Sequence, residues 1–291
     1  MHTHGKSIGW AIVVNLIITI CEYIGGVLSG SLALISDAAH NLSDVISLTL
    51  SWIGEKLTGK KPSAKYTFGW KRMEIFTALI NALALWGIAF YIVYESFQRF
   101  ADPPHIILSI MIPIASISLL GNVISMIILH KDKHETINLK AAYLHLFYDA
   151  ISSLAVIAAA IIMKITGNMV FDLIISFTIA AMIFWGGLDI LKKAVHILMM
   201  GTPDDIEISE VYKSIASLEH VRDVHNLHLW SINSQEVFLS CHIVLDCCPS
   251  HENDEILQSV KTLLWNDYGI EHHVIQLENE LQCRSSAPGL F

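Results

Sequence analysis

The amino-acid sequence predicts an α-helical membrane protein, with six transmembrane helices followed by a small cytosolic α/β domain. Of its 291 residues, 53% are hydrophobic and only 15% are charged, whereas a soluble domain usually carries about 25% charged residues. The deficit is uneven, because residues 8–200 form a series of long apolar runs and residues 203–291 have the composition of a soluble domain. We therefore expect a transmembrane domain over residues 1–200 and a cytosolic domain over residues 201–291.

Six apolar segments are each long enough to cross a bilayer, which takes about 20 residues of helix. The first segment is too long for the core of a signal peptide and no small-residue cleavage site follows it, so we expect it to remain as the first span. Asp102-Pro103-Pro104 marks a helix stop after the third segment. The predicted spans cover residues 8–28, 33–55, 73–97, 106–129, 139–163 and 169–191.

Lysine and arginine residues gather in alternate loops. The loops on one side hold only Arg99 and Lys164. Cytosolic loops of membrane proteins carry an excess of basic residues, so we expect both termini to lie in the cytosol. The basic residues of the loops after the second, fourth and sixth spans are Lys56, Lys60, Lys61, Lys65, Lys71, Arg72, Lys131, Lys133, Lys140, Lys192 and Lys193.

The segment after the last span reads as helix, strand, strand, helix, strand. Its helices have apolar residues at helical spacing, and its first two strands are joined near Asn233-Ser234. An α-β-β-α-β order predicts a small open sandwich. The expected elements cover residues 205–218, 224–232, 237–243, 252–266 and 273–277.

Ionisable residues recur inside two of the predicted spans. The second span contains His40 and Asp44, and the fifth contains His145 and Asp149, so both hold the pattern His-x-x-x-Asp. An aspartate in the middle of a span costs about 2.5–3.5 kcal/mol on insertion scales and indicates a function by default. Positions i and i+4 lie on one face of a helix. Each pair therefore offers an imidazole nitrogen and a carboxylate oxygen to the same point.

Two such helices facing each other supply four ligands, the number that zinc prefers in tetrahedral geometry. The set holds no thiolate, which disfavours copper(I), and its imidazoles disfavour magnesium and calcium. Its two carboxylates give the empty site a charge of −2, which a divalent cation cancels, so metal release should be linked to proton uptake. The alternative is two hydrogen-bonded pairs that only hold helices together. Repetition of one spacing in two spans favours the metal site.

The other polar residues of the spans favour simpler roles. Asp37 lies one turn before His40, and it either supports a ligand from behind or lies near the outer surface. Asp172 lies near a span end, where a solvated or a capping role costs little. Four further residues are expected to form hydrogen bonds between helices: Glu22, Asn15, Asn81 and Asn122.

Four stretches of the chain carry a family resemblance. They are SLALISDAAHNLSD at 31–44, YTFGW at 66–70, HLFYD at 145–149 and HNLHLW at 225–230. With these motifs in this order over nearly its whole length, the chain resembles the cation diffusion facilitator family, and in particular its zinc-transporter branch. The resemblance implies a homodimeric metal/proton antiporter in the plasma or inner membrane of a prokaryote, which exports zinc(II) from the cytosol.

Position by position, the resemblance places the transport site on the four ligands named above. A histidine at position 40 resembles members that prefer zinc over cadmium. The family resemblance also implies that the tail is a metallochaperone-like cytosolic domain for regulation and dimerisation. In this domain His225, His242 and Glu278 match a second metal site of some members. His251 is a looser match. Lys71, in place of a histidine of many relatives, puts a metal site in that loop in doubt, and Gln276 stands where some bacterial relatives carry a histidine.

Other functions remain open at this stage. The same mechanism could serve iron(II), manganese, cobalt, nickel or cadmium, and a membrane-bound metal sensor is a second class. A metalloenzyme needs an open coordination position, which four protein ligands do not leave, so we expect no enzyme. The net charge of −9 argues against a nucleic-acid partner. The expected partners are a divalent metal ion, membrane lipid, protons as counter-ion and a second copy of the chain.

Overall fold

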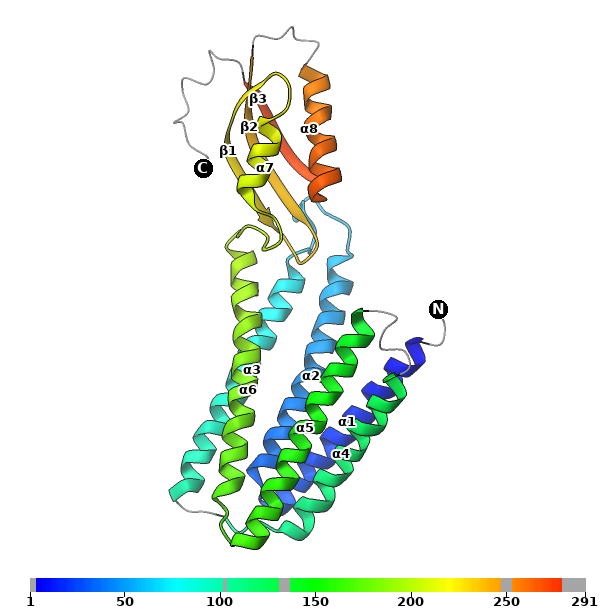
Figure 1. Ribbon diagram of the computed structural model, residues 1–291, viewed down its shortest axis with the longest axis vertical. Coiled ribbons are helices and arrows are strands. Elements are labelled where there is room, and N and C mark those ends of the chain that lie inside the picture. Colours follow the sequence, from blue (N-terminus) through cyan, green and yellow to red (C-terminus); the bar gives the residue numbers. More distant parts are fainter. Residues whose placement is uncertain (1–3, 102–103, 131–136, 247–252, 279–291) are drawn as a thin grey trace. The chain divides into compact units, whose positions relative to one another are not determined.

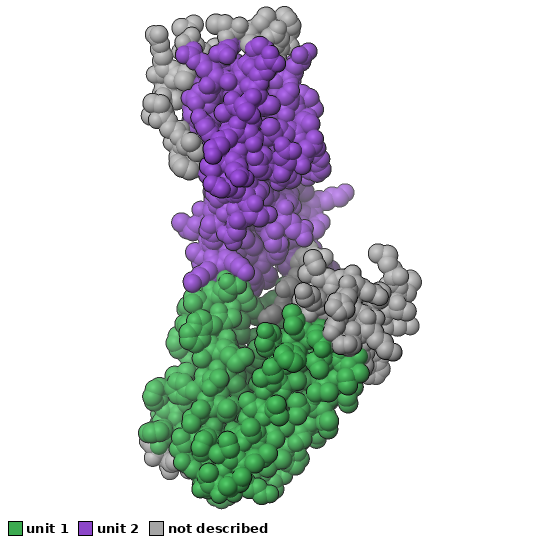
Figure 2. Space-filling view, viewed as in Figure 1, with its two compact units in different colours: residues 1–52, 80–191 green, residues 53–79, 192–291 purple. Residues whose placement is uncertain are grey.

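The computed structural model describes residues 4–101, 104–130, 137–246 and 253–278 (Figure 1). It divides into two compact units, one formed by residues 1–52 and 80–191 and the other by residues 53–79 and 192–291 (Figure 2). This division follows spatial contacts, and the domain boundary predicted after residue 200 stays a prediction.

Each predicted span corresponds to one long helix, and the fold class is confirmed. Four helices are long and apolar enough to cross a membrane over Met73–Phe100, Leu108–Ile127, Tyr143–Thr166 and Val170–Leu198. In the described part of the first helix the apolar stretch is the shorter segment Asn15–Ser29. The second helix has a lower mean hydropathy because ionisable residues interrupt it. The helices are α1 (His4–Ser29), α2 (Leu32–Thr58), α3 (Met73–Ala101), α4 (Leu108–His130), α5 (Ile137–Thr166) and α6 (Val170–Leu198).

Besides an apolar core, the helical unit buries several polar side chains and exposes many large apolar ones, unlike a soluble protein. Glu22 and Asn122 are completely buried, and Asp149 is 2% exposed, whereas Phe100 is 69% and Ile165 is 79% exposed. A soluble protein rarely buries carboxylates while exposing large apolar side chains. In a bilayer the preference is reversed, because lipid solvates exposed apolar side chains well and polar groups need hydrogen-bond partners inside the bundle. The burial pattern therefore supports the membrane assignment independently of hydropathy.

Helix α4 packs against α1 and α5, and two glycines let α1 approach its neighbours. A Cβ atom added to Gly25 would meet the Ile114 side chain of α4 at 2.7 Å, and one added to Gly26 would meet Ile35 of α2 at 2.6 Å. Small residues at such positions allow helices to pack closely in membranes.

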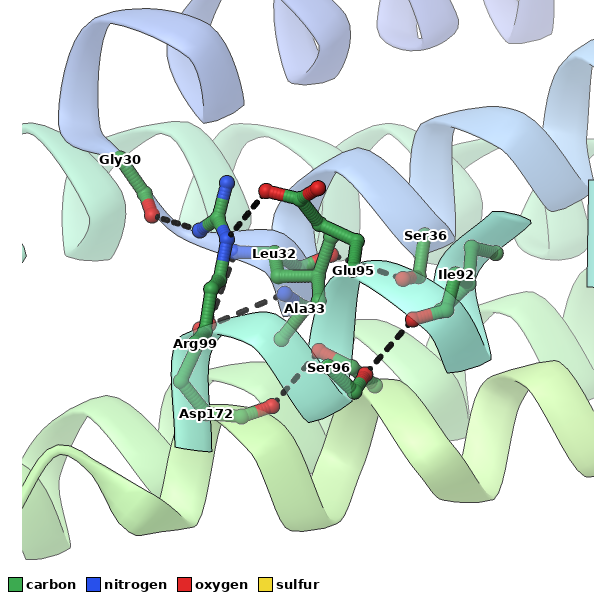
Figure 3. A network of polar contacts seen from close by, with 10 residues as sticks. Gly30, Leu32, Ala33, Ser36, Ile92, Glu95, Ser96, Arg99 and Asp172 are labelled. Carbon is green, nitrogen blue, oxygen red and sulfur yellow. Dashed lines mark hydrogen bonds and ion pairs between the residues drawn. The ribbon is translucent and has the colours of Figure 1, made fainter. Parts of the chain in front are cut away.

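A polar network secures the start of α2 (Figure 3). The Asp172 carboxylate of α6 accepts hydrogen bonds from Ser31 Oγ at 2.6 Å and from the backbone N–H groups of Leu32 at 2.8 Å and Ala33 at 3.3 Å. Arg99 of α3 donates to the Gly30 carbonyl at 2.6 Å. A carboxylate accepts hydrogen bonds from the free N–H groups at the start of a helix, and its negative charge interacts favourably with the positive end of the helix dipole. Of the solvated and capping roles expected for Asp172, the structure shows capping, at the start of α2 two turns before the His-x-x-x-Asp motif.

The second unit contains the tail in the predicted α-β-β-α-β order. Strands β1 (Val221–Ser231) and β2 (Val237–Leu245) pair antiparallel, and β3 (His272–Glu278) adds to β2 in parallel. A parallel pair needs a long crossover, which α8 (Asn253–Tyr268) supplies, and α7 (Ile208–Ala216) precedes the sheet. The tail has its own core, which includes Val211, Ile215, Leu227, Leu239, Ile243, Val260 and Leu264.

The loop before α3 belongs to the same unit and contacts the β1–β2 hairpin. Lys71 forms an ion pair with Glu236, and Glu74 accepts a hydrogen bond from Ser234. The ring of Phe68 packs edge-on against Phe238, with centroids 5.6 Å apart. Lys71 thus has a structural partner in the tail.

Candidate metal centre

The structure brings the four predicted membrane ligands into one cluster. His40 and Asp44 lie one turn apart on α2, and His145 and Asp149 lie one turn apart on α5. His145 Nε2 lies 3.4 Å from Asp44 Oδ2 and 3.5 Å from Asp149 Oδ2, and His40 Nε2 lies 3.9 Å from Asp149 Oδ1. Ligand atoms of His40, Asp44 and Asp149 all lie within 4.8 Å of one another. Two residue pairs separated by about 100 positions in the sequence therefore form one cluster.

Two of these distances are close to the edges of a zinc tetrahedron. Bonds of 2.0–2.2 Å around zinc place neighbouring ligand atoms about 3.3–3.6 Å apart, which agrees with the two distances from His145 Nε2, whereas the 3.9 Å between His40 and Asp149 is longer. Both carboxylate oxygens of Asp149 and Oδ2 of Asp44 are buried and lack a hydrogen-bond partner among the described residues. Buried carboxylate oxygens normally have partners. The cluster therefore offers buried carboxylate oxygens to a cation, and no hydrogen bond between described residues satisfies these three oxygens.

Residues behind the cluster join α2 to α5. Asp37 is 2% exposed, so the alternative that placed it at the outer surface is wrong. It accepts hydrogen bonds from Ser152 at 2.5 Å and Ser153 at 3.5 Å, and Ser152 lies one turn after Asp149 on α5. Metal sites depend on such outer partners to orient their ligands. The sequence signal for Ser152 was its helical spacing from Asp149, which was not recognised.

Glu22 of α1 forms a hydrogen bond to another helix, as predicted. Its Oε2 atom accepts a hydrogen bond from Asn41 Nδ2 of α2 at 2.7 Å. Asn41 is 1% exposed and follows the proposed ligand His40 directly. Its role was not recognised from the sequence, where an asparagine beside a histidine carries no periodic signal.

In the tail, His225, His242 and Glu278 also converge. His225 of β1 is paired with His242 of β2, and Glu278 ends β3. His242 Nδ1 lies 2.7 Å from Glu278 Oε1, and His225 Nε2 lies 3.4 Å from Glu278 Oε2. His225 Nε2 and Glu278 Oε2 have no hydrogen-bond partner among the described residues. The ligand atoms of all three residues lie within 4.8 Å of one another, so the sheet presents a possible three-ligand site.

The sheet register explains this convergence. Residues directly opposite on neighbouring strands share a face, and so do residues two apart on one strand. Gln276 lies opposite His242, and its Nε2 donates to Glu278 Oε1 at 2.9 Å. A bulge follows His225, where Asn226 has a φ of 49°, and bulges of this kind redirect neighbouring side chains. Gln276 thus supports Glu278 where some relatives have a histidine ligand.

The nearby cysteine is unsuited to metal binding. Cys241 is a free, buried cysteine whose side chain alternates away from its neighbour His242 along β2. Burial raises the pKa of the Cys241 thiol to about 12, which disfavours a free thiolate, and its side chain lies on the opposite face of the sheet from His242. His251, the looser match, lies outside the described residues, as do Cys247, Cys248 and Cys283.

The fold and this cluster define the class as a helical membrane protein that gathers imidazole and carboxylate side chains inside its bundle. The sequence also matches the family model of the cation efflux transmembrane domain over residues 10–199 and that of the cation efflux protein cytoplasmic domain over residues 203–280. The chain therefore belongs to the cation diffusion facilitator family, and it is an integral membrane protein and cation efflux transporter.

Relatives that are named as metal transporters match nearly the whole chain. The cadmium, cobalt and zinc/H(+)-K(+) antiporter of Bacillus subtilis (strain 168) is 37% identical over 98% of this chain and 94% of its own length. The zinc transporter ZitB of Escherichia coli (strain K12) is 34% identical over 88% of this chain and 82% of its own. A solved structure, the metal-bound C-terminal domain of the CzcD transporter from Cuprividus metallidurans, is 32% identical, covers 25% of this chain and 99% of its own, and has a TM-score of 0.24.

Proposed function

We propose that this protein is a secondary active transporter that exports zinc(II) from the cytosol in exchange for protons. The metal binds between α2 and α5 to His40, Asp44, His145 and Asp149. The observation that carries the proposal is the convergence of these four side chains with carboxylate oxygens that lack partners. Relatives are named as zinc transporters and as a zinc/H(+)-K(+) antiporter.

The charge of the site supplies the link to protons. Two carboxylates and two neutral imidazoles sum to −2, which zinc(II) cancels in a medium of low dielectric constant. After zinc leaves, the buried negative charge is costly unless protons or water replace the metal. Metal release on one side of the membrane is therefore coupled to proton uptake there. Flux of zinc, cadmium, cobalt, manganese, iron(II) and nickel into proteoliposomes under an imposed pH gradient tests both the metal and the counter-ion.

Another divalent metal is the alternative substrate. Imidazole and carboxylate ligands suit several first-row metals, and relatives are named for cadmium and cobalt as well as zinc. A membrane-bound sensor is disfavoured because it does not need both His-x-x-x-Asp pairs buried together within the bundle. Zinc flux that does not exceed the flux of the other metals would reassign the substrate while leaving the transport mechanism intact.

The proposed orientation places both termini in the cytosol, following the excess of lysine and arginine in alternate loops. We expect Asn168→Cys, in the loop between α5 and α6, to react with a membrane-impermeant thiol reagent on intact cells. Ser63→Cys, in the loop between α2 and α3, should react only after the cells are opened. Both positions are exposed in the structure, and the unmodified chain measures the background from its own cysteines. Labelling of both positions on the same side contradicts the topology.

We propose that the tail forms a homodimer and binds regulatory zinc through His225, His242 and Glu278. The tail has its own core, so residues 203–291 can be studied as a fragment. Zinc that binds only the folded fragment should stabilise it by about 2.7 kcal/mol at a hundredfold excess over Kd, measured by thermal unfolding.

The matched variants are His242→Ala and His228→Ala. His242 contacts Glu278, whereas His228 is an exposed residue of the same sheet. We expect His242→Ala to remove the zinc-dependent shift in Tm and His228→Ala to retain it. An equal shift in both variants would show that zinc binds elsewhere on the tail.

A further inference from the structure

A second pair of carboxyl groups lies buried in the helical unit, between α1 and α2. Glu22 is completely buried and Asp37 is 2% exposed. The two carboxyl groups are close enough for one to donate a hydrogen bond to the other. None of the hydrogen bonds of this pair involves one of the four proposed metal ligands. Neither carboxyl group is one of the four proposed metal ligands, and a supporting role through hydrogen bonds does not by itself explain why two acids are buried together.

Every hydrogen-bond donor to the pair is neutral. Asn41 donates to Glu22 Oε2 at 2.7 Å, and Ser152 donates to Asp37 Oδ1 at 2.5 Å. Glu22 Oε1 receives no hydrogen bond from a described residue. Two ionised carboxylates this close, buried and without a cation, would be strongly destabilised. A single proton shared between the two carboxyl groups removes one charge and supplies the missing donor.

Helix α4 contributes buried polar groups to the region around Glu22. Ser118 of α4 bonds to Ser153 at 2.9 Å and lies within hydrogen-bonding reach of Glu22. Asn122 follows Ser118 by one turn, on the same face of α4. It is completely buried, and neither its Oδ1 nor its Nδ2 has a partner among the described residues. A fully buried amide without such a partner is unusual, and it adds a polar group to the helix whose Ser118 lies within reach of Glu22.

We propose that Glu22 and Asp37 together form a proton-binding site of the transporter, separate from the four metal ligands. This inference rests on the proposed function. The pair holds a shared proton while the metal site is empty, and the proton leaves when zinc binds.

The electrostatic reason is the charge of the neighbouring site. The titratable groups that act on Asp37 from the helices around it are Glu22 of α1, His40 of α2 and Asp149 of α5. The empty metal site, with a charge of −2, disfavours a second negative charge nearby. Zinc cancels that charge, so ionisation of the pair becomes less costly and its proton is released. Zinc occupancy and protonation of the pair therefore exclude each other, as exchange transport requires.

The test is the number of protons released per zinc bound, measured with the purified full-length protein in weakly buffered solution containing a pH indicator. We expect Glu22→Gln to bind zinc within about threefold of the wild-type affinity, because glutamine keeps the shape and can still accept the Asn41 hydrogen bond. It should release about one proton fewer per zinc. Asp37→Asn should show the same loss, and the double variant should lose no more, because the proton is shared.

The control is Glu95→Gln, which also removes one carboxylate from the helical unit but lies beside Arg99 on α3, and it should release the wild-type number of protons. An unchanged proton number in Glu22→Gln and Asp37→Asn overturns the proposal, as does folded protein that no longer binds zinc. Repetition with potassium replaced by choline distinguishes protons from a monovalent metal ion. A difference between variants that follows potassium rather than pH also overturns it.

Failure of the proposed function has a different signature. It would appear as absent zinc binding in the wild type, or as unchanged zinc binding in Asp149→Asn, whatever the proton count of Glu22→Gln.

Discussion

Asp149→Asn is expected to abolish zinc transport. Asp149 is the most buried of the four proposed ligands, at 2% exposed, and its two carboxylate oxygens face both histidines of the cluster. The amide keeps the volume of the side chain but removes one of the two negative charges that zinc(II) needs for compensation. It also replaces a charged ligand by a weak neutral one. Loss of an outer-shell partner already costs about 10–100-fold in metal affinity, so loss of this ligand should cost more.

The measurements are zinc affinity of the purified protein and zinc flux in proteoliposomes. The matched control is Tyr148→Phe, which alters the neighbouring position on α5, where the side chain is 56% exposed. We expect wild-type flux from the control and flux at the background level from Asp149→Asn, with both proteins folded and inserted. Substantial zinc flux through Asp149→Asn would remove Asp149 from the site and refute the tetrahedral ligand set.

His40→Asp is expected to change metal selectivity rather than abolish transport. The substitution keeps four ligands, but it exchanges an imidazole for a harder oxygen and takes the empty site from −2 to −3. Carboxylate and imidazole differ in the metals and geometries that they favour. We therefore expect cadmium to gain on zinc by about tenfold in competitive flux, a difference of about 1.4 kcal/mol between the two metals.

The same variant should alter the response to pH. An unperturbed histidine titrates near pH 6.5 and must be neutral to bind metal. Zinc affinity of the wild type should therefore fall as the pH drops through this region, and removal of one imidazole should weaken that dependence. The experiment is competitive zinc and cadmium flux at two pH values on either side of 6.5 for wild type and His40→Asp. An unchanged metal ratio together with an unchanged pH dependence would mean that His40 does not contact the metal.

These two variants probe residues that the sequence alone singles out. A charged residue inside an apolar run is conspicuous because few positions tolerate it, and a spacing of four places two side chains on one helical face. Both are local properties of the chain. The six helices and the α-β-β-α-β tail follow in the same way from local hydrophobic periodicity and length, and each matched a segment of the structure to within a few residues.

The supporting residues depend on how helices face one another. The sequence left the role of Asp37 open between a support and the outer surface, and only the packing of α2 against Ser152 of α5 decided it. Asn41 was not recognised, because an asparagine beside a ligand has meaning only when Glu22 of another helix meets it. Hydrogen bonds between residues 19 or 115 positions apart depend on helix rotation and translation. Local periodicity does not encode either quantity.

The sequence alone thus determined the identities of the candidate ligands. The free-energy cost of placing a charged side chain in the bilayer and the spacing of residues along a helix are both properties of single segments. Their convergence was decided by tertiary structure. Packing of α1, α2, α4 and α5 placed two ligand pairs within 3.4–3.9 Å of each other, and sheet register placed His225 opposite His242. Packing of α1 against α2 also buried Glu22 beside Asp37, since a carboxyl group acquires its hydrogen-bond partners and electrostatic neighbours only when the helices pack together.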